Sequence, residues 1–308
     1  MPAYDVLVYG PIFCDLIFTG LPDVPNLGKE LFADHLTVSL GGSAIVASGL
    51  RRLGLKVGLI ADLGGDPFSQ IVWGLLQEND IDVSLIRKTK ESLKQVTVAL
   101  SYPEDRAFVT RFEQLNTPID LSGILQDNPT QHLHICSFLA ALDNPEAAQT
   151  ARSVGASVSA DFGWDEKALL DPKLLKLVAE LDVFLPSKAE IFQMMQDSHL
   201  ESAAEKMLST MKHGDLIVKV GRRGVIGFQK DTSDPKHVPA ISVEAVDTTG
   251  AGDAFDAGFL FAYLNKMSMQ DCLMYGVICG GLTTTIPGGT EGFPSDKEIE
   301  EWLSKLQS

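Results

Sequence analysis

The stretch Asp247-Thr-Thr-Gly-Ala-Gly-Asp253-Ala-Phe-Asp-Ala-Gly-Phe-Leu260 is the most informative part of this chain. It follows an apolar run at residues 241–246, which we predict to be a strand, and it begins a predicted helix. Small residues at Gly250, Ala251 and Gly252 let backbone approach a ligand closely. Because their N–H groups would converge at a helix N-terminus, the stretch predicts an anion site.

An acidic residue at this point needs its own explanation, because Asp253 would repel a bound phosphate. Its presence makes sense if the carboxylate meets a hydroxyl that is about to attack the phosphate. The carboxylate then takes the proton while the N–H groups hold the charge that develops. The alternative is a glycine-rich turn in which Asp253 only caps the helix. The residues alone leave both interpretations open.

Around this stretch, short apolar runs of strand length alternate with helical segments. This order is typical of βαβ units, so we predict an α/β fold with a parallel sheet and helices on both faces. Ligands of such sheets lie at the carboxyl ends of the strands. The predicted strands are 4–10, 57–61, 132–136, 157–161, 182–185 and 216–220, and the helices are 43–53, 66–79, 145–154, 172–181 and 200–211.

Two segments do not follow this alternation of strands and helices. Residues 31–40 and 95–112 are extended and have no helix within them. In the second, Val96 and Val98 alternate with Thr97 and Ala99, which is the period of a strand. We therefore predict a small sheet that stands off the main body of the protein.

Composition limits the class of protein. The 308 residues carry a formal net charge of -16, which should repel nucleic acid and anionic membranes. The first basic residue is Lys29, so the N-terminus lacks the positive start of a signal peptide, and no apolar run is long enough to span a bilayer. We expect a cytoplasmic protein with neither nucleic acid nor membrane as a partner.

The spacing of the cysteines and histidines does not suggest a metal site. The cysteines have no close spacing that would suit a metal, so we expect free thiols in a reducing compartment. His132 and His134 alternate as they would on one face of a strand, without a carboxylate or cysteine cluster beside them, and we expect a structural role. The cysteines are Cys14, Cys136, Cys272 and Cys279.

The Asp-Thr-x-Gly-Ala-Gly-Asp core of the stretch resembles the C-terminal signature of the PfkB (ribokinase-like) carbohydrate kinase family. Further landmarks of that family follow one another in order, so the resemblance covers nearly the whole chain. They are Asp15 after the first strand, Gly41-Gly42, Gly65-Asp66-Pro-Phe68, Pro186-Ser187-Lys-Ala-Glu190 and Lys219-Val-Gly221-Arg-Arg-Gly224.

The resemblance implies a ribokinase-like three-layer fold, with a mostly parallel central sheet and a small β-sheet lid. It implies one kinase domain over residues 1–308, with the lid formed by about 13–19, 30–40 and 94–113. The implied activity is the ATP-dependent phosphorylation of a hydroxyl of a small sugar or sugar-like substrate. A homodimer formed through the lid is a further hypothesis.

The resemblance also implies roles for single residues. Asp253 is the general base, and the amides of Gly250, Ala251, Gly252 and Asp253 form an anion hole for the transferred phosphoryl group. The substrate-binding residues are Phe13, Asp15, Gly41 and Gly42, and the nucleotide-binding residues are Ser187, Lys219, Gly221 and Gly224. Glu190 helps to organise Mg²⁺ through water, and Asp247 and Thr249 match positions that bind a monovalent cation, K⁺, in some members.

Several of these residues have a plainer alternative role. Asp15 could cap a strand end, and Gly41-Gly42 could form only a turn. Glu190 could be a first-turn acid stabilised by its helix dipole. Asp247 could simply begin a turn.

The chain departs from the family pattern near the substrate. Ile45 or Val46 stands where the family usually carries an Asn, and Phe13 stands where ribokinases place another. Ser187 replaces the Asn of the Pro-Asn-x-x-Glu motif. A buried site built for hydroxyls does not readily exchange amides for hydrocarbon, so the sequence argues against ribose as substrate.

Other classes fit less well. The chain has neither the Gly-x-x-x-x-Gly-Lys-Ser/Thr of P-loop kinases nor a Gly-x-Gly-x-x-Gly after its first strand. A kinase-like protein that binds a sugar or nucleotide and regulates a partner is the main rival. The acceptor stays open among sugar, sugar phosphate and nucleoside. Arg106 and Arg111 could bind a substrate phosphate or could equally be solvated strand residues.

Overall fold

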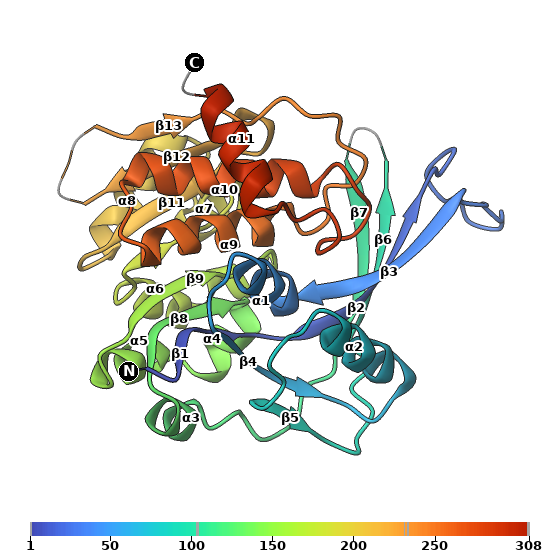
Figure 1. The fold of residues 1–308 in the computed structure, drawn as a ribbon, viewed down its shortest axis with the longest axis horizontal. Coiled ribbons are helices and arrows are strands. Elements are labelled where there is room, and N and C mark those ends of the chain that lie inside the picture. Colours follow the sequence, from blue (N-terminus) through green and yellow to red (C-terminus); the bar gives the residue numbers. More distant parts are fainter. Residues whose placement is uncertain (1, 103–104, 231, 233, 307–308) are drawn as a thin grey trace.

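The computed structural model describes residues 2–102, 105–230, 232 and 234–306. Their centre is a nine-stranded sheet in the order β13-β12-β11-β10-β9-β8-β1-β4-β5, which runs across Figure 1. The strands from β11 to β5 are parallel, whereas β12 and β13 extend the β11 edge in antiparallel fashion. Its strands are β1 (Tyr4–Tyr9), β4 (Val57–Leu63), β5 (Ile86–Lys88), β8 (Thr130–Cys136), β9 (Ser157–Asp161), β10 (Val183–Phe184), β11 (Asp215–Lys219), β12 (Val225–Gln229) and β13 (Lys236–Val238).

Helices cover both faces of this sheet and give it two hydrophobic cores. In β1, Val6 and Val8 point into one core and Leu7 into the other, because successive side chains of a strand face opposite ways. One face is covered by α1 (Ser43–Arg52), α2 (Pro67–Glu78), α9 (Ala251–Leu264), α10 (Met269–Thr283) and α11 (Asp296–Leu306). The other face is covered by α3 (Leu121–Asp127), α4 (Phe138–Asp143), α5 (Ala147–Ser153), α6 (Pro172–Val178), α7 (Lys188–Met195) and α8 (Leu200–Thr210).

A second sheet of four strands stands off the large one, at the right of Figure 1. Its order is β3-β2-β6-β7. β2 pairs antiparallel with β3 and parallel with β6, and β6 and β7 form an antiparallel hairpin. The strands are β2 (Ile12–Thr19), β3 (His35–Gly42), β6 (Val96–Ser101) and β7 (Arg106–Arg111). The predicted three-layer α/β architecture with a small separate sheet is therefore confirmed.

The prediction of a strand at residues 241–246 is wrong. These residues are irregular, and the preceding strand β13 ends before Pro239, which has no amide to continue a ladder. The amides of Val246 and Asp247 donate instead to the carbonyl of Thr284, just beyond α10. The segment that leads into α9 is thus tied to the end of a helix rather than to a strand.

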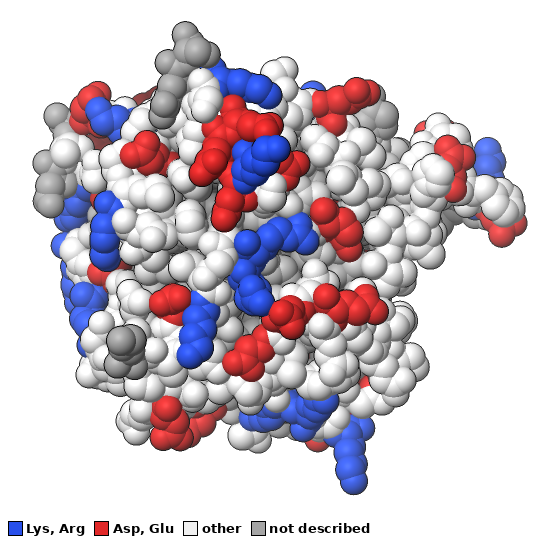
Figure 2. Space-filling model, viewed as in Figure 1, with Lys and Arg blue, Asp and Glu red and all other residues white. Residues whose placement is uncertain are grey.

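The surface carries both signs of charge. Figure 2 shows basic side chains among acidic ones on the viewed face, with an acidic group over α11. Asp296, Glu298, Glu300 and Glu301 lie on that helix. All four cysteines are free and buried, as expected. Among the helices of the described residues, none is both long and apolar enough to cross a bilayer.

Asp66 joins α2 to the base of the small sheet. Its carboxylate caps α2 by accepting hydrogen bonds from the amide and hydroxyl of Ser69, and it also accepts from the amides of Leu93 and Lys94, just before β6. Burial alone would raise the pKa of Asp66, but the hydrogen bonds from Lys94 and Ser69 hold it below its usual value. One side chain therefore fixes the position of two segments.

Replacing Asp66 by Ala should destabilise the fold by about 2 to 4 kcal/mol, because a helix cap is lost and two further amides lose their acceptor. Asp120→Ala is the matched control. Asp120 is an exposed cap of α3 that accepts from one amide, that of Gly123, and its loss should cost about 1 kcal/mol or less. Urea unfolding measures both costs. Equal costs for the two variants would show that the link from Asp66 to β6 contributes nothing.

Candidate active site

The segment before α9 forms a tight turn whose shape requires glycine. Gly250, the N-cap of α9, has a φ of 71°, in the left-handed region that favours glycine. A Cβ on Gly250 would lie 2.7 Å from the Cα of Gly289, so only hydrogen fits there. The first helical turn leaves amides without intrahelical acceptors, and the helix dipole adds positive potential. Ala251 also donates to the Thr248 carbonyl at 3.3 Å. The start of α9 therefore has the form expected of an anion site, and its use as one stays a prediction.

Asp253 lies in the first turn of α9, at the same place. Burial is the main cause that raises its pKa, to about 7, and the negative charge of Asp161 adds to it. The positive charges of Lys219 and Arg106 oppose this rise. A carboxyl group with a pKa near neutrality can accept a proton at physiological pH and release it afterwards. The geometry and the pKa both suit a general base.

Asp15 brings a second buried carboxyl to this site from β2. Burial first, and then the charges of Asp253 and Asp247, raise its pKa to about 7. A Cβ on Gly41 would lie 2.2 Å from an oxygen of Asp15, so the carboxyl group occupies the space of that missing side chain. The structure thus brings Asp15 and Gly41 together with Asp253, although they are far apart in the sequence.

Apolar groups lie beside these carboxyls. The ring of Phe13 packs against that of Phe112, with centroids 5.8 Å apart. A Cβ on Gly42 would meet the Phe13 ring at 2.9 Å. Ile45 is buried, and its side chain lies against Gly250, since a Cβ there would be 3.0 Å from its Cδ1. Phe13 and Ile45 thus put hydrocarbon at positions where the resemblance implies amides.

Asp247 organises the loop before α9. It is buried and accepts hydrogen bonds from the amide and hydroxyl of Thr249 and from the amide of Gly288. The hydroxyl of Ser101, at the end of β6, also donates to it. These contacts realise the plainer alternative, in which Asp247 begins a turn. The monovalent cation site of Asp247 and Thr249 stays a prediction.

The small sheet touches the same loop through a second contact. Arg106, the first residue of β7, donates a hydrogen bond to the hydroxyl of Thr248, and its Nε is buried without a partner. Arg111, at the other end of β7, is largely exposed and pairs with Glu113. Of the two arginines considered as phosphate ligands, only Arg106 reaches the loop before α9.

The proposed nucleotide residues lie at the carboxyl ends of β10 and β11. Ser187 and Glu190 form a capping box at the start of α7, in which each side chain bonds the amide of the other residue. Burial raises the pKa of Glu190 to about 7, with a further rise from Asp161. Gly221 and Gly224 bound a short 3-10 turn, η2 (Gly221–Arg223), between β11 and β12. Glu190 is thus a first-turn acid, as in the plainer alternative, and it also takes part in a capping box, whereas its role toward Mg²⁺ stays a prediction.

The side chain of Lys219 turns toward acidic residues that the sequence did not single out. Its Nζ lies 2.6 Å from Oδ2 of Asp161 and 3.1 Å from Oδ1 of Asp256. Asp256 is fully buried, 4.0 Å from Nε2 of His134. The signal for Asp256 was present, because an acid interrupts an apolar helix there. Asp161 gave no local signal, since its partners come from other elements.

The two histidines are structural in their contacts, as predicted. His132 and His134 both bond the hydroxyl of Ser159 at 2.7 Å, and His132 also bonds Ser157. Burial lowers the pKa of each imidazole to about 3. Within the part of the chain that the structure describes, no group of three or more His, Cys, Asp or Glu residues could hold a metal ion.

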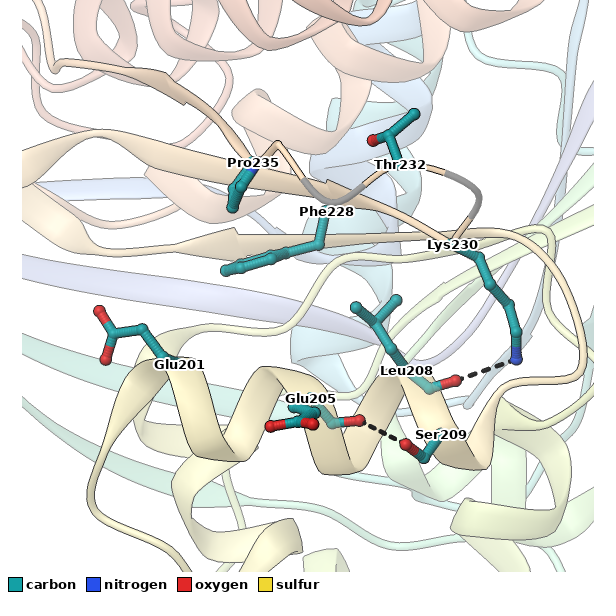
Figure 3. A pocket seen from close by; sticks show the side chains of 8 residues that line it. All are labelled: Glu201, Glu205, Leu208, Ser209, Phe228, Lys230, Thr232 and Pro235. Carbon is teal, nitrogen blue, oxygen red and sulfur yellow. Dashed lines mark hydrogen bonds between the residues drawn. The ribbon is translucent and has the colours of Figure 1, made fainter.

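A pocket that no predicted site residue lines lies elsewhere. It has a volume of about 430 Å³ and is shown in Figure 3, between α8 and the far end of β12. Phe228 and Leu208 point into it, with Glu201 and Glu205 on the helix side. β12 starts at the η2 turn and runs away from it, so this pocket is separate from the residues described above.

Comparisons with known proteins agree with this geometry. The family described as pfkB family carbohydrate kinase matches residues 5–296. A fructokinase of Salmonella typhimurium is 29% identical over 281 residues, which cover 84% of this chain and 90% of that protein. A putative ribokinase from Agrobacterium tumefaciens aligns at a TM-score of 0.85 and 18% identity, over 99% of this chain and 98% of that one. A putative ribokinase II from E. coli in complex with ATP and Mg²⁺ aligns at a TM-score of 0.81 and 23% identity, over 98% of this chain and 99% of that one. The fold is thus ribokinase-like, as predicted.

The raised pKa of Asp253 predicts how stability depends on pH. An unfolded aspartate ionises near pH 3.8 and the folded one near 7, so the fold loses stability as the pH rises between these values. Asn carries no proton to lose. Asp253→Asn should therefore match the wild-type Tm near pH 4 and exceed it by roughly 2 to 8 °C at pH 8.

Asp296→Asn is the control, because Asp296 is an exposed acid in the first turn of another helix, α11. The negative charge of Asp296 interacts favourably with the dipole at the start of α11. This variant should therefore gain no stability over the wild type as the pH rises. Thermal unfolding followed by circular dichroism at several pH values measures both. A pH-independent Tm difference for Asp253→Asn would contradict the buried, proton-accepting state of Asp253.

Proposed function

The chain belongs to the pfkB family of carbohydrate kinases, which are phosphotransferases acting on sugar hydroxyls, and on this premise we propose that Asp253 is the general base of an ATP-dependent sugar kinase. The observation that carries the proposal is that two carboxyls, the buried Asp15 and the partly buried Asp253 at the start of α9, lie close enough for the charge of Asp253 to raise the pKa of Asp15. One carboxyl can hold an acceptor hydroxyl while the other removes its proton.

The proposed reaction is a direct transfer. Asp15, with the backbone of Gly41 and Gly42, holds hydroxyls of the acceptor beside Phe13. Asp253 takes the proton of the attacking hydroxyl, whose oxygen forms a bond to the γ-phosphorus as the bond to the ADP oxygen breaks. The amides of residues 250–253 stabilise the charge on the transferred group. Proton, phosphoryl group and leaving ADP are then all accounted for.

The residues present fit ATP and Mg²⁺. The start of α9 offers amides and a favourable dipole to phosphate oxygens, and the side chain of Lys219, two residues before the η2 turn with Gly221 and Gly224, reaches that start. Ser187 would contact the nucleotide, and the carboxyl of Glu190 would orient water around Mg²⁺. The metal would neutralise phosphate charge, and it commonly uses few protein ligands. Asp247 and Thr249 are the proposed K⁺ position.

The acceptor is proposed to be a sugar other than ribose. Phe13 and Ile45 present hydrocarbon where polar contacts to ribose are expected, whereas Val46 is packed in the core. The similarity to a fructokinase makes a ketohexose the first acceptor to test. A sugar phosphate or a nucleoside is the alternative acceptor, and a non-catalytic regulator is the alternative class. ATP turnover on a panel of sugars, sugar phosphates and nucleosides separates these possibilities.

The small sheet is the proposed lid, built from residues of about 13–19, 30–40 and 94–113 of a single kinase domain. Ser101 and Arg106 attach it to the loop before α9. A lid excludes water, which would otherwise accept the phosphoryl group. Phe108 and Val109 are exposed on the same hairpin, and a homodimer through the lid would cover them. A kinase with free thiols fits the cytoplasm as its compartment.

Asp253→Asn should lower kcat by about 10² to 10⁴-fold, because the variant cannot accept the proton, while ATP affinity stays close to that of the wild type. Steady-state kinetics with the best acceptor of the panel, together with calorimetric ATP binding, measure this. Asp296→Asn, the exposed helix-start acid on α11, should retain full activity. A variant of Asp253 that keeps more than about half of the turnover would exclude it as the base.

Lid closure should appear in hydrogen exchange. An acceptor and a nonhydrolysable ATP analogue, added together, should slow the exchange of β3, β6 and β7 amides along with those at the start of α9. The nucleotide alone should protect mainly the start of α9. Protection of α9 by both ligands without any change in the small sheet would refute its role as a lid.

A further inference from the structure

Three ionisable side chains meet at the carboxyl ends of two strands. Lys219 ends β11, and Asp161 ends β9. The lysine side chain crosses the short strand β10 between them to reach Asp161 at 2.6 Å. Asp256 joins from α9, at 3.1 Å from the same nitrogen. The three side chains are 13%, 16% and 0% exposed, so this charge cluster is shielded from solvent.

The cluster lies directly behind the start of α9. Asp256 follows Asp253 by one helical turn, so both side chains are on the same side of the helix. A Cβ on Gly252 would be 3.6 Å from Nζ of Lys219, in ordinary van der Waals contact. The ammonium group is therefore next to the backbone whose amides would hold the phosphoryl group. A buried cation at this distance acts on that position through a low dielectric.

Two of the charges hold each other in place. Burial alone would raise the pKa of Asp161, but Lys219 and the hydrogen bond of Asp256 hold it below its usual value. Burial alone would lower the pKa of Lys219, but Asp161 and Asp256 raise it. Burial raises the pKa of Asp256 well above its usual value, and its hydrogen bond with Asp161 adds to this. Lys219 and Asp161 thus form the ion pair of the cluster, and Asp256 is the member whose negative charge burial disfavours most.

We propose that Lys219 is a positioning residue of the phosphoryl site, whose ammonium, fixed by Asp161 and Asp256, supplies the positive charge behind the amides of α9 and keeps Asp253 ready to accept a proton. The proposal rests on the proposed kinase function. It differs from a direct nucleotide contact of the Lys219 side chain, since that side chain is engaged with two carboxyls. A nucleotide contact of this residue would then be one of its main chain.

The groups that face Asp253 fix the sign of the expected effect. Lys219 on β11 and Arg106 on β7 lower its pKa, whereas Asp161 on β9 and Asp15 on β2 carry charge of the same sign as its own. Without the ammonium of Lys219, no cation of this cluster offsets the negative charges of the neighbouring carboxylates. The pKa of Asp253 should then rise, and the charge on the transferred phosphoryl group should lose support.

The test compares Lys219→Met, Asp161→Asn and the control Lys206→Met. Lys206 also pairs with an aspartate, Asp197, at 2.6 Å, but it lies on α8 and is half exposed. Lys219→Met should lower kcat at least tenfold, leave the calorimetric Kd for ATP within about threefold, and move the acidic limb of kcat/KM to higher pH by about one unit. Asp161→Asn, which keeps the shape of the side chain, should move that limb to lower pH. Lys206→Met should change none of these values.

Two results would overturn the proposal. One is an unchanged acidic limb in both cluster variants. The other is a loss of ATP affinity of more than about tenfold with unchanged kcat in Lys219→Met, which would indicate a direct nucleotide contact. Circular dichroism checks the fold, and Asp161→Asn decides the question if Lys219→Met does not fold. Wild-type protein without turnover on any acceptor would contradict the kinase function instead. NMR titration of Asp253, assigned with Asp253→Asn, then reads the same pKa changes without turnover.

Discussion

The structure depends on how buried carboxyl groups are kept at one edge of the large sheet. Each such group loses the solvation of its charge, a penalty that must be offset by donors or cations, or avoided by protonation. Asp247 is surrounded by hydroxyl and amide donors, and Asp161 has an ammonium group. Asp15 and Asp253 have weaker compensation, and their pKa values lie near 7. The residues proposed to react thus belong to the group of carboxyls whose charge the fold compensates poorly, a group that also includes Glu190 and Asp256.

Close backbone approach is the second requirement of the site. The turn at Gly250 packs against Gly289, and the carboxyl of Asp15 fills the side-chain space of Gly41. Neither contact would survive a Cβ. Because these glycines let loops and side chains occupy the same small volume, acids from β2 and α9 meet although the strands and helices that carry them belong to different sheets and layers. The small sheet completes the arrangement through Ser101 and Arg106.

The sequence predicted the parts of the fold that local pattern controls. Alternating strand and helix runs gave the layers, and the small residues before Asp253 gave the start of α9 at Ala251. The local sequence pattern gave wrong or no predictions where contacts with distant residues determine the structure. Residues 241–246 looked like a strand, but their neighbouring amides bond Thr284 instead. The pairing of Asp161 with Lys219 depends on two strands separated by β10, so no spacing in the sequence could reveal it.

The position of α9 and α10 in the chain has a consequence for synthesis. These helices supply much of the hydrophobic core on one face of the large sheet, where α9 packs against α1. They emerge from the ribosome long after β1, β4 and α1, whose apolar surfaces on that face stay uncovered until then. Exposed apolar surface of this kind makes an incomplete chain prone to aggregate during this interval. Such a chain also lacks Asp253, the proposed base, until α9 has been made, so it would have no means to transfer phosphate to an acceptor.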